Sequence, residues 1–281
     1  MRIGIVGTEN SHADHYVRNF NEHKRYGDHR IVALSGGRSE RNEKLAGAGG
    51  IEQIVENPAD LIGRIDAAIV CSRDGRQHRA EATTLLDASI PVLVDKPLAC
   101  DVPDAQAILD AAHRAKVAVS SSSALRWADA TTELAVRLGQ GSRPDLVAVT
   151  GPADPASEYG GIFFYGIHVV EIALALVPDR PVTDIAVEAL SDTVVVTALA
   201  GGTRLLLELV RPDSRNQVPW RVVTAGPSGS IVEEIRLGED YAAPSMDVFV
   251  EMLDSGRSPL TEDELLAPVR LLSTVAEALA E

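Results

Sequence analysis

The stretch Val94-Asp95-Lys96-Pro97-Leu98 follows the apolar run Ile90–Val94 and precedes a helical pattern that starts near Val102. A buried strand followed by a helix is the repeating unit of parallel sheets. A lysine at the end of such a strand lies at the mouth of the sheet, where open α/β sheets bind ligands. The stretch therefore predicts a fold class and, at Lys96, a place for function.

Apolar runs alternate with helical patterns on both sides of this stretch. The runs expected to form strands are Arg2–Gly7, Arg30–Ser35, Ala67–Cys71, Val92–Val94 and Val117–Ser120. Helices are expected at Ser11–Phe20, Glu40–Ala48, Arg79–Ala88 and Pro103–Ala115, with a shorter helical segment that ends at Ala59–Ile62. This alternation indicates βαβ units and a parallel sheet of the Rossmann type.

The composition is that of a globular protein of 281 residues, long enough for one large domain or two ordinary ones. The net charge of −15, from 26 basic and 41 acidic residues, argues against nucleic acid and anionic membranes as partners. Cys71 and Cys100 fit neither a disulfide framework nor a metal motif. With a strand pattern from Arg2 and no membrane-length apolar run, we expect a cytoplasmic protein.

The turn after the first strand reads Gly7-Thr8-Glu9-Asn10-Ser11-His12, where a dinucleotide-binding fold has Gly-x-Gly-x-x-Gly. Only the first glycine is present. Glu9 places a negative charge where phosphates would lie, and His12 is bulky where the helix should pack closely on the strand. The backbone N–H groups of the helix still favour an anion. A Rossmann fold with a weakened or lost cofactor site is the alternative.

The end of the second strand reads Leu34-Ser35-Gly36-Gly37-Arg38-Ser39 and lacks the acidic residue that binds the ribose of NAD. Arg38 with Ser35 or Ser39 matches a 2′-phosphate instead, which favours NADP, with NAD as the second choice. A solvated loop cation is the alternative role for Arg38.

A metal site is a competing interpretation of the first turn. His12 and His15 share a helix face, and Glu9 lies close in sequence. Since no further ligand is marked by its spacing, we predict no metal.

The second half contains short β-branched segments separated by Gly, Asp and Pro, which is typical of a meander. These segments are Leu146–Thr150, Ile185–Leu190, Val194–Leu199, Arg204–Val210, Arg221–Ala225 and Ser230–Ile235. Helices are expected at Thr131–Leu138, Ile167–Val177, Pro244–Ser255 and Glu262–Ala280. The serine run Ser120–Ser123 is interpreted as a loop at the domain junction, because no His and Asp spacing marks it as nucleophilic.

An antiparallel sheet with helices on one face commonly dimerises through the other. The apolar runs Val194–Val196 and Leu205–Leu207 would be costly if they were left exposed. We therefore predict a homodimer or homotetramer that forms through the sheet of the second half.

Four stretches resemble the glucose–fructose oxidoreductase / inositol dehydrogenase / MocA oxidoreductases. They are Ile3–Gly7, Asp66–Ser72 with His78, Asp95–Ala99 (close to the family's Glu-Lys-Pro-Leu-Ala), and Gly160-Gly161 followed by Gly166-Ile167-His168 and Glu171. The C-terminal segments also run in the family's order, so the resemblance covers essentially the whole chain.

The resemblance implies a Rossmann dinucleotide-binding domain at residues 1–122. A C-terminal α/β domain with a large, mostly antiparallel open sheet, for substrate binding and oligomerisation, would follow at 123–281. The implied activity is hydride transfer between a nicotinamide and a carbohydrate-like or related small polar metabolite. Lys96 would be the electrostatic partner of the reacting oxygen and His168 the general acid/base, roles that suit a buried ammonium and an imidazole.

Further residues are assigned to binding from the strand ends and from the resemblance. The expected cofactor contacts are Gly7, Thr8, Glu9, Asn10, Ser11, His12, Ser35, Arg38, Cys71, Ser72, His78, Asp95, Lys96 and Pro97. The expected substrate contacts are Arg126, Trp127, Phe164, Tyr165 and Glu171. For Arg126, an ion pair that packs the domain is the alternative.

The chain departs from the family pattern near the expected base. The acid that precedes the family's Gly-x-His segment falls on Phe164, which removes a carboxylate that would bind substrate or orient the histidine. The pair Phe164-Tyr165 predicts a substrate less polar than a free sugar. Two other functions stay open: a relative that uses the nicotinamide only transiently, for elimination or hydrolysis, and a binding or accessory protein that kept the fold without the cofactor.

Overall fold

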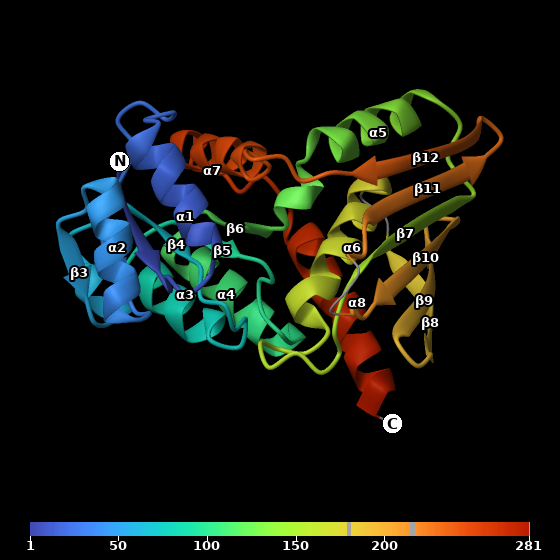
Figure 1. The fold of residues 1–281 in the computed structure, drawn as a ribbon, viewed down its shortest axis with the longest axis horizontal. Helices are drawn as coiled ribbons and strands as arrows, with labels where there is room; N and C mark the ends of the chain where they lie inside the picture. Colours follow the sequence, from blue (N-terminus) through green and yellow to red (C-terminus); the bar gives the residue numbers. More distant parts are fainter. Residues whose placement is uncertain (179–180, 214–216, 281) are drawn as a thin grey trace. The chain divides into compact units, whose positions relative to one another are not determined.

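The computed structural model describes residues 1–178, 181–213 and 217–280; residues 179–180, 214–216 and 281, all within the predicted second domain, lie outside the described residues. The chain forms two compact units (Figure 1). The N-terminal unit contains Met1–Ser122 and Ala242–Glu262, and the C-terminal unit contains Ser123–Tyr241 and the chain from Asp263 onward. Each unit is built around a sheet of its own.

The N-terminal unit contains a six-stranded sheet in the order β3-β2-β1-β4-β5-β6, in which every neighbouring pair is parallel. This is the strand order of the Rossmann fold. The strands are β1 (Arg2–Val6), β2 (Arg30–Ser35), β3 (Gln53–Val55), β4 (Ala67–Val70), β5 (Val92–Asp95) and β6 (Val119–Ser122). The helices are α1 (His12–Val17), η1 (Arg18–Glu22), α2 (Ser39–Gly49), η2 (Pro58–Leu61), α3 (His78–Leu86), α4 (Val102–Ala115) and α7 (Ala243–Ser255).

The burial of the strands explains why their sequences are continuous apolar runs. All four residues of β4 and all four of β5 are buried, as expected for strands covered by helices on both faces. Two expectations are corrected here. The last strand is Val119–Ser122 rather than Val117–Ser120, so most of the serine run lies in a strand and not in a loop. The short strand β3 was not predicted, because only three residues form it.

The segment Ala242–Glu262 corrects the predicted domain division, since it packs with the N-terminal unit although the sequence assigned it to the second domain. The ring of Phe249 on α7 lies 6.4 Å from the ring of Phe20. The hydroxyl of Tyr26 donates to Oδ1 of Asp247 at 2.9 Å. The apolar face of α7 is therefore part of the core of the N-terminal unit.

The C-terminal unit contains a second six-stranded sheet in the order β12-β11-β7-β10-β9-β8. Its strands are β7 (Leu146–Pro152), β8 (Val182–Ala189), β9 (Thr193–Ala200), β10 (Thr203–Val210), β11 (Trp220–Gly226) and β12 (Gly229–Ile235). Its helices are η3 (Ala124–Arg126), α5 (Asp129–Gln140), α6 (Phe163–Leu176) and α8 (Glu262–Ala280). The sheet is not a simple meander, because β7 is inserted between β10 and β11 and runs parallel to β10.

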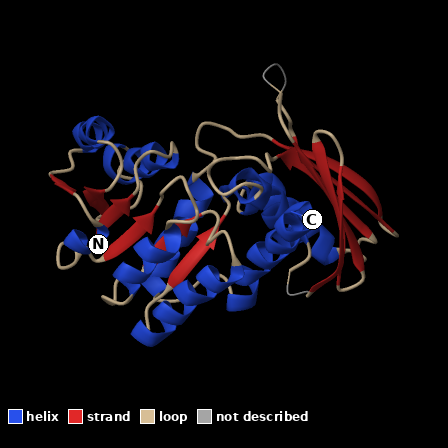
Figure 2. Cartoon of the chain, turned by 90° about the horizontal axis from the view of Figure 1, so that it is seen from below, coloured by secondary structure: helices blue, strands red, loops and turns tan. Residues whose placement is uncertain are grey.

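Helices cover one face of this second sheet. Along β9, buried residues alternate with partly exposed ones, as expected for a sheet with one covered face. Helix α6 packs on β7 and β10, and α5 packs on β12 and α6. Figure 2 shows the helices of this unit together on one side of these strands. The predicted fold class, a parallel Rossmann sheet followed by a mostly antiparallel open sheet, is confirmed.

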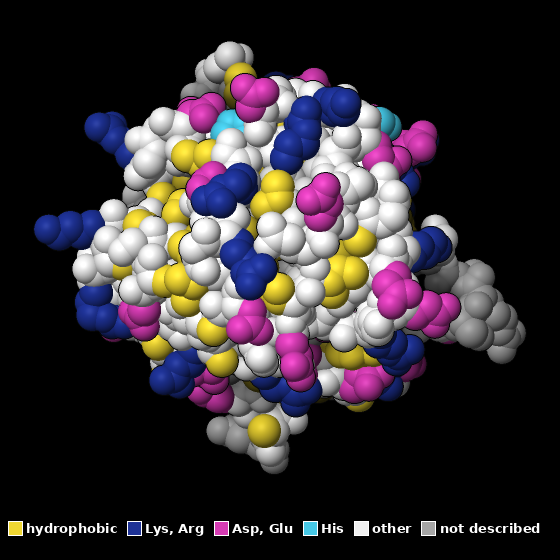
Figure 3. Space-filling model, turned by 90° about the vertical axis from the view of Figure 1, so that its left-hand side faces the viewer, with side chains coloured by type: hydrophobic (Ala, Val, Ile, Leu, Met, Phe, Trp, Pro, Cys, Tyr) yellow, Lys and Arg dark blue, Asp and Glu magenta, His cyan; other side chains and the backbone are white. Residues whose placement is uncertain are grey.

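The surface charges and the helices concern two partners that the sequence argues against, nucleic acid and membranes. On the face of the molecule drawn in Figure 3, basic and acidic side chains are interspersed rather than gathered into a patch of one sign. Within the described ranges, no helix combines the length and the apolar character that crossing a membrane requires.

Candidate functional site

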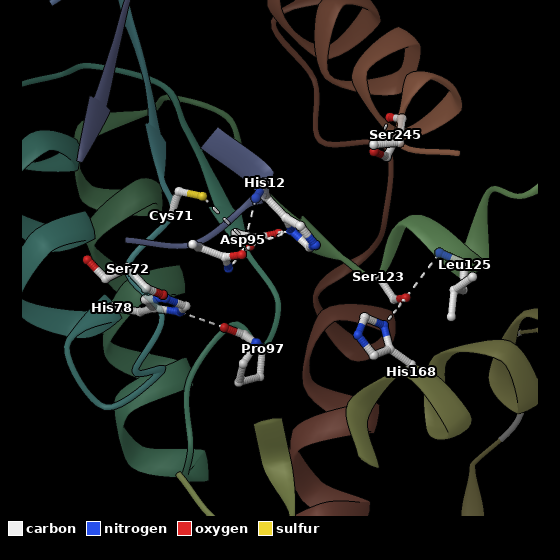
Figure 4. A network of polar contacts seen from close by, with 12 residues as sticks. His12, Cys71, Ser72, His78, Asp95, Pro97, Ser123, Leu125, His168 and Ser245 are labelled. Atoms are coloured by element: carbon white, nitrogen blue, oxygen red, sulfur yellow. Dashed lines mark hydrogen bonds and ion pairs between the residues drawn. The ribbon is translucent and has the colours of Figure 1, made fainter. Parts of the chain in front are cut away.

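The carboxylate of Asp95, at the end of β5, is the centre of a buried polar network in the N-terminal unit (Figure 4). Nδ2 of Asn10 donates to its Oδ2 at 3.1 Å, and Nδ1 of His12 lies 2.8 Å from the same oxygen. Burial alone would raise the pKa of Asp95, but the nearby His12 imidazole and the Lys96 ammonium hold that pKa well below its usual range. Asp95 is therefore an ionised buried carboxylate.

Lys96 follows Asp95 and is buried. Burial lowers the pKa of Lys96, and the attraction of Asp95 opposes this shift. An ammonium in this setting is partly desolvated, so it interacts strongly with negative charge that develops nearby. This is the property expected of a lysine that stabilises a reacting oxygen.

The first glycine of the fingerprint turn is required by packing. Gly7 has φ +78°, and a Cβ there would lie 2.5 Å from the backbone of Ser72. Its N–H donates to the carbonyl oxygen of Ser35 at 2.9 Å. The turn thus crosses close to the ends of β2 and β4, as in a dinucleotide-binding fold.

Polar side chains hold the rest of the turn where the family motif has glycines. Arg41 on α2 donates to the carbonyl oxygen of Thr8 at 3.0 Å, and the hydroxyl of Thr8 donates to Asn42. Arg73 donates to the carbonyl oxygen of Glu9 at 2.7 Å. These contacts hold the turn through the carbonyl oxygens of Thr8 and Glu9 and through the side chain of Thr8. They replace part of the stability that close packing of glycines would give the turn.

Two carboxyl groups lie beside this turn. Oε2 of Glu9 and Oε2 of Glu81 are buried without a hydrogen-bond partner among the described residues. Ser72 donates to the other oxygen of Glu81 at 2.8 Å. Burial raises the pKa of Glu81 to about 7; the hydrogen bond from Ser72 opposes the shift and the neighbouring Glu9 adds to it. The two carboxyl groups give the turn a negative character, which would repel the phosphates of a dinucleotide.

His78 contacts the backbone after two strands through its two ring nitrogens. Its side chain is fully buried, with Nδ1 2.7 Å from the carbonyl oxygen of Pro97 and Nε2 2.9 Å from that of Ser72. Burial lowers the pKa of His78, against the two carbonyl contacts. The imidazole therefore ties the loop after β4 to the loop after β5 and positions Lys96 indirectly.

The other predicted cofactor residues differ in how accessible they are. The side chains of Thr8, Ser35 and Cys71 are fully buried, and the hydroxyl of Ser35 has no partner among the described residues. Arg38 is exposed and stands at the N-cap of α2, next to Ser39. Ser11, at the N-cap of α1, is exposed as well. Arg38 is thus the accessible cation at the end of β2.

In the C-terminal unit, α6 places His168 in a mostly apolar interior (Figure 4). Its Nδ1 lies 2.6 Å from the hydroxyl oxygen of Ser123. The ring of Trp220 is 5.2 Å away and that of Tyr165 is 5.8 Å away, measured between centroids. Phe164 is partly exposed, and its ring meets that of Tyr165 edge to face with the centroids 4.8 Å apart. The imidazole therefore contacts the hydroxyl group of Ser123 and is flanked by aromatic rings.

Arg126 and Glu171, predicted to bind substrate, form a buried ion pair with 3.3 Å between Nη1 and Oε2. Glu264 on α8 is a second partner of Arg126, also at 3.3 Å. Burial raises the pKa of Glu171 to about 7, although Arg126 attracts its carboxylate. Arg126 also lies 5.7 Å from the ring of Trp127. These contacts are those of an ion pair that packs the domain, which is the alternative role given to Arg126 from the sequence.

The structure gathers the predicted residues into two clusters. Asn10, His12, Asp95 and Lys96 belong to the N-terminal unit, and Ser123 and His168 belong to the C-terminal unit. The pairing of Lys96 with His168 stays a prediction, as do the binding roles. Within the described residues, no group of three or more His, Cys, Asp or Glu side chains is arranged to hold a metal ion.

Some residues of these clusters were missed on sequence. Ser123 was interpreted as part of a loop, and Arg41 and Glu81 were not singled out. Their partners lie 9 to 45 positions away in the chain, so no local spacing marks them. The N-cap position of Ser123 before η3 is the one local signal that favours a fixed hydroxyl there.

A parallel Rossmann sheet and a mostly antiparallel open sheet, each in a unit of its own, define a two-unit α/β protein. Residues 1–123 match the model of a family described as an oxidoreductase family with an NAD-binding Rossmann fold, GFO_IDH_MocA. Over these residues the resemblance expected from the sequence is confirmed.

Individual relatives agree with this assignment. Inositol 2-dehydrogenase 1 of Saccharopolyspora erythraea is 38% identical over 107 residues, which cover 37% of this chain and 31% of the relative. The matched region thus spans about a third of the length of that relative. The solved structure of GenD2 from gentamicin A biosynthesis, in complex with NAD, has a TM-score of 0.84 at 18% identity and covers 100% of this chain and 94% of its own. A myo-inositol dehydrogenase from Corynebacterium glutamicum has a TM-score of 0.81 at 18% identity, with 99% and 96% covered. These two likenesses show the fold of the whole chain.

Proposed function

We propose that the chain is an NAD(P)-dependent oxidoreductase that transfers a hydride between a nicotinamide and a small polar metabolite related to carbohydrates. The observation that carries the proposal is Lys96, a buried ammonium next to the ionised Asp95 at the carboxyl end of β5. The family match of the same unit and the names of the relatives, which are inositol dehydrogenases, support it.

The residues around the turn fit a dinucleotide in two respects and oppose it in one. Gly7 keeps the tight turn beside β4, and Lys96 follows the carboxyl end of β5, the edge of the sheet at which Rossmann folds bind ligands. The carboxyl group of Glu9 opposes the phosphates, since its Oε2 is buried near Glu81 without a hydrogen-bond partner among the described residues. A bound dinucleotide would supply the hydride acceptor or donor. Gly7, Asn10 and Lys96 are the residues proposed to hold it.

The proposed cofactor is NADP, with NAD as the second choice. Arg38 is exposed at the N-cap of α2, and the first turn of that helix starts with Ser39. A guanidinium beside a helix N-terminus favours a phosphate group. No acid stands at the end of β2 to bind a ribose hydroxyl pair.

The residues proposed to act on the substrate are Lys96 and His168. An ammonium next to the substrate oxygen would stabilise the negative charge that develops there. The imidazole would exchange the proton of the hydroxyl group. The aromatic rings of Tyr165 and Trp220 beside His168 favour a substrate with an apolar face, in agreement with the loss of the family's acid at Phe164.

The test combines nucleotide binding with turnover. NADP and NAD are titrated while the fluorescence of Trp127 and Trp220 is followed, and oxidation of myo- and scyllo-inositol is followed by the absorbance of the reduced nicotinamide. We expect binding of at least one cofactor, and a rate that falls about 10²- to 10⁴-fold in Lys96→Met and in His168→Gln. Lys44→Met, on the exposed face of α2, is the matched control. Turnover that is unchanged in both site variants would refute the assignment.

A binding or accessory function without cofactor is the second candidate, and the buried Oε2 of Glu9 is the observation that favours it. Such a protein would keep the fold while the like charge excludes phosphates from the turn. No binding of NADP or NAD at millimolar concentration, in a protein whose circular dichroism shows it folded, would select this candidate.

Self-association through the second sheet is part of the proposal. A mostly apolar row of side chains crosses all six strands on the face away from the helices. It consists of Ala186, Thr197, Leu206, Ala148, Val223 and Val232. An apolar row of this length on a surface favours contact with a second copy of the chain. Light scattering at micromolar concentration should give a dimer or tetramer, and the mass of one chain would contradict it.

A further inference from the structure

The loop after β4 carries a cation at the point of the sheet where dinucleotides bind. The strand order β3-β2-β1-β4-β5-β6 reverses its direction between β1 and β4, and Rossmann folds bind their ligand at the carboxyl edge beside that reversal. Arg73 follows Cys71 and Ser72 after the end of β4, and it is partly buried. Arg73 therefore stands in the loop that adjoins the fingerprint turn.

The guanidinium group of Arg73 links the two loops that meet at this reversal. Its Nη2 donates to the carbonyl oxygen of Glu9 at 2.7 Å. The loops are close elsewhere as well, since a Cβ on Gly7 would lie 2.5 Å from the backbone of Ser72. A carbonyl oxygen is a neutral acceptor, and an arginine in a protein stays protonated. The contact with Glu9 therefore places a permanent positive charge beside the fingerprint turn without cancelling it.

Lys96 is a second cation at the same edge of the sheet. Burial lowers the pKa of Lys96; the carboxylate of Asp95 opposes this shift, and the guanidinium group of Arg73 adds to it. The two cations thus repel one another, and Asp95 is also in contact with His12. A bound anion would relieve the repulsion between Arg73 and Lys96, so this edge favours a ligand that carries negative charge.

We propose that Arg73 binds the diphosphate group of the dinucleotide and supplies the attraction that the second glycine of the fingerprint provides in other Rossmann folds. That glycine lets the backbone approach the phosphates, whereas Glu9 occupies its position in this chain. The planar guanidinium group matches phosphate oxygens in its geometry, and its charge opposes that of the Glu9 carboxyl group. The inference rests on the proposed function and goes beyond it by naming the group that binds the phosphates.

Two arginines would then bind different parts of NADP. Arg38, at the N-cap of α2, is the residue proposed for the 2′-phosphate, and Arg73, after β4, is the residue proposed for the diphosphate. Two small probes separate these roles. Adenosine 2′-monophosphate contains only the phosphate assigned to Arg38, and inorganic pyrophosphate contains only the group assigned to Arg73.

Three substitutions separate the charge of Arg73 from its hydrogen bond to the turn. Arg73→Met removes both, Arg73→Gln keeps an N–H donor for the carbonyl oxygen of Glu9 without the charge, and Arg73→Lys keeps the charge. Arg64→Met is the matched control. Arg64 precedes β4, at the amino end of the same strand, where it is exposed and donates to the side-chain oxygen of Gln53 at 3.2 Å. Its loss changes the net charge by the same amount.

The measurement is the Kd of the full-length protein for NADP and for the two probes, by calorimetry for NADP and by phosphorus NMR for the probes. We expect the Kd for NADP and for pyrophosphate to rise about 10- to 100-fold in Arg73→Met and in Arg73→Gln. The Kd for adenosine 2′-monophosphate should change less than about threefold, because it lacks the diphosphate. Arg73→Lys should recover most of the affinity, and Arg64→Met should bind like the wild type.

The outcomes distinguish this inference from the proposed function. An unchanged Kd for NADP in Arg73→Met would overturn the inference and leave the proposed function intact. Wild-type affinity in Arg73→Gln would also overturn it, as would an equal loss for adenosine 2′-monophosphate. If Arg73→Met does not fold by circular dichroism, Arg73→Gln decides by the same criteria.

A wild-type protein that binds no nicotinamide dinucleotide would overturn the proposed function. Pyrophosphate then decides the inference by itself. Binding of pyrophosphate that is weakened in Arg73→Met and Arg73→Gln, but not in Arg64→Met, would support a diphosphate site at Arg73. No binding of pyrophosphate, or equal binding in all variants, would overturn it.

Discussion

Two buried carboxyl groups, Asp95 in the N-terminal unit and Glu171 in the C-terminal unit, have nearly the same exposure, 5% and 4%. Their pKa values nevertheless move in opposite directions. The pKa of Asp95 lies well below its usual range, and that of Glu171 is raised to about 7. Burial acts in the same sense on both groups, so the groups around them decide the difference.

The surroundings differ in the number of donors and in the neighbouring charge. Asp95 accepts from Asn10, contacts His12 through both of its oxygens and precedes Lys96. Glu171 shares a single cation, Arg126, with the second carboxylate of Glu264. The comparison teaches that the N-terminal network keeps the carboxylate of Asp95 ionised beside Lys96. The C-terminal network tolerates a carboxyl group that can take up a proton near neutral pH.

The largest expected effect comes from removing the charge of Asp95. In Asp95→Asn the amide cannot pair with His12, and the negative charge that opposes the effect of burial on Lys96 is lost. We expect the free energy of unfolding to fall by about 3 kcal/mol or more, as for other buried ion pairs that lose one partner. Urea denaturation at pH 7 measures this change.

The control for Asp95→Asn is the same substitution on the surface. Asp263 contacts Arg270 at 3.2 Å while both side chains are largely exposed. Asp263→Asn should change the free energy of unfolding by less than about 1 kcal/mol. Equal losses of unfolding free energy in the two variants would show that the network around Asp95 contributes no more to stability than a surface ion pair.

Glu171 should give a medium effect that depends on pH. Its pKa is raised to about 7 in the folded protein from an ordinary value near 4.5, so the folded state binds more protons than the unfolded state between these pH values. The contribution of Glu171 to stability therefore declines as the pH rises through this window, and it is constant above it. Glu171→Gln, which resembles the protonated form, should lack this decline.

The measurement is the difference in unfolding free energy between Glu171→Gln and the wild type at pH 5 and pH 8. We expect this difference to move in favour of the variant by about 1–3 kcal/mol as the pH rises. Glu133→Gln, on the exposed face of α5, should give a difference independent of pH. A difference for Glu171→Gln that also stays constant would mean that Arg126 keeps the carboxylate ionised, as His12 and Lys96 do for Asp95.

The same contrast explains what could be predicted from the sequence. The strand Arg30–Ser35 and the helix Glu262–Ala280 end where the sequence predicted, because apolar periodicity and nearby Gly or Pro residues are local signals. Lys96 and His168 were found through motifs. The partners that set their chemistry, such as Ser123 for His168, come from elements far apart in the chain, and a serine in a run of four carries no mark of the histidine it will meet.

The smallest expected effect tests a third carboxyl group, Glu9, which resembles Glu171 in having a carboxyl neighbour and whose Oε2 is buried without a hydrogen-bond partner among the described residues. Glu9→Gln removes a like charge from the turn that would face phosphates. We expect the Kd for NADP to fall about fivefold, which corresponds to about 1 kcal/mol. Glu52→Gln, at an exposed glutamate before β3, should leave the Kd unchanged.

Because the pKa of Glu81 is raised to about 7, wild-type binding of NADP should also tighten below pH 7, and this gain in affinity should shrink in Glu9→Gln. Weaker binding in Glu9→Gln would mean that the carboxyl group helps to hold the cofactor, and the N-terminal site would then be organised by donors on both sides of the turn.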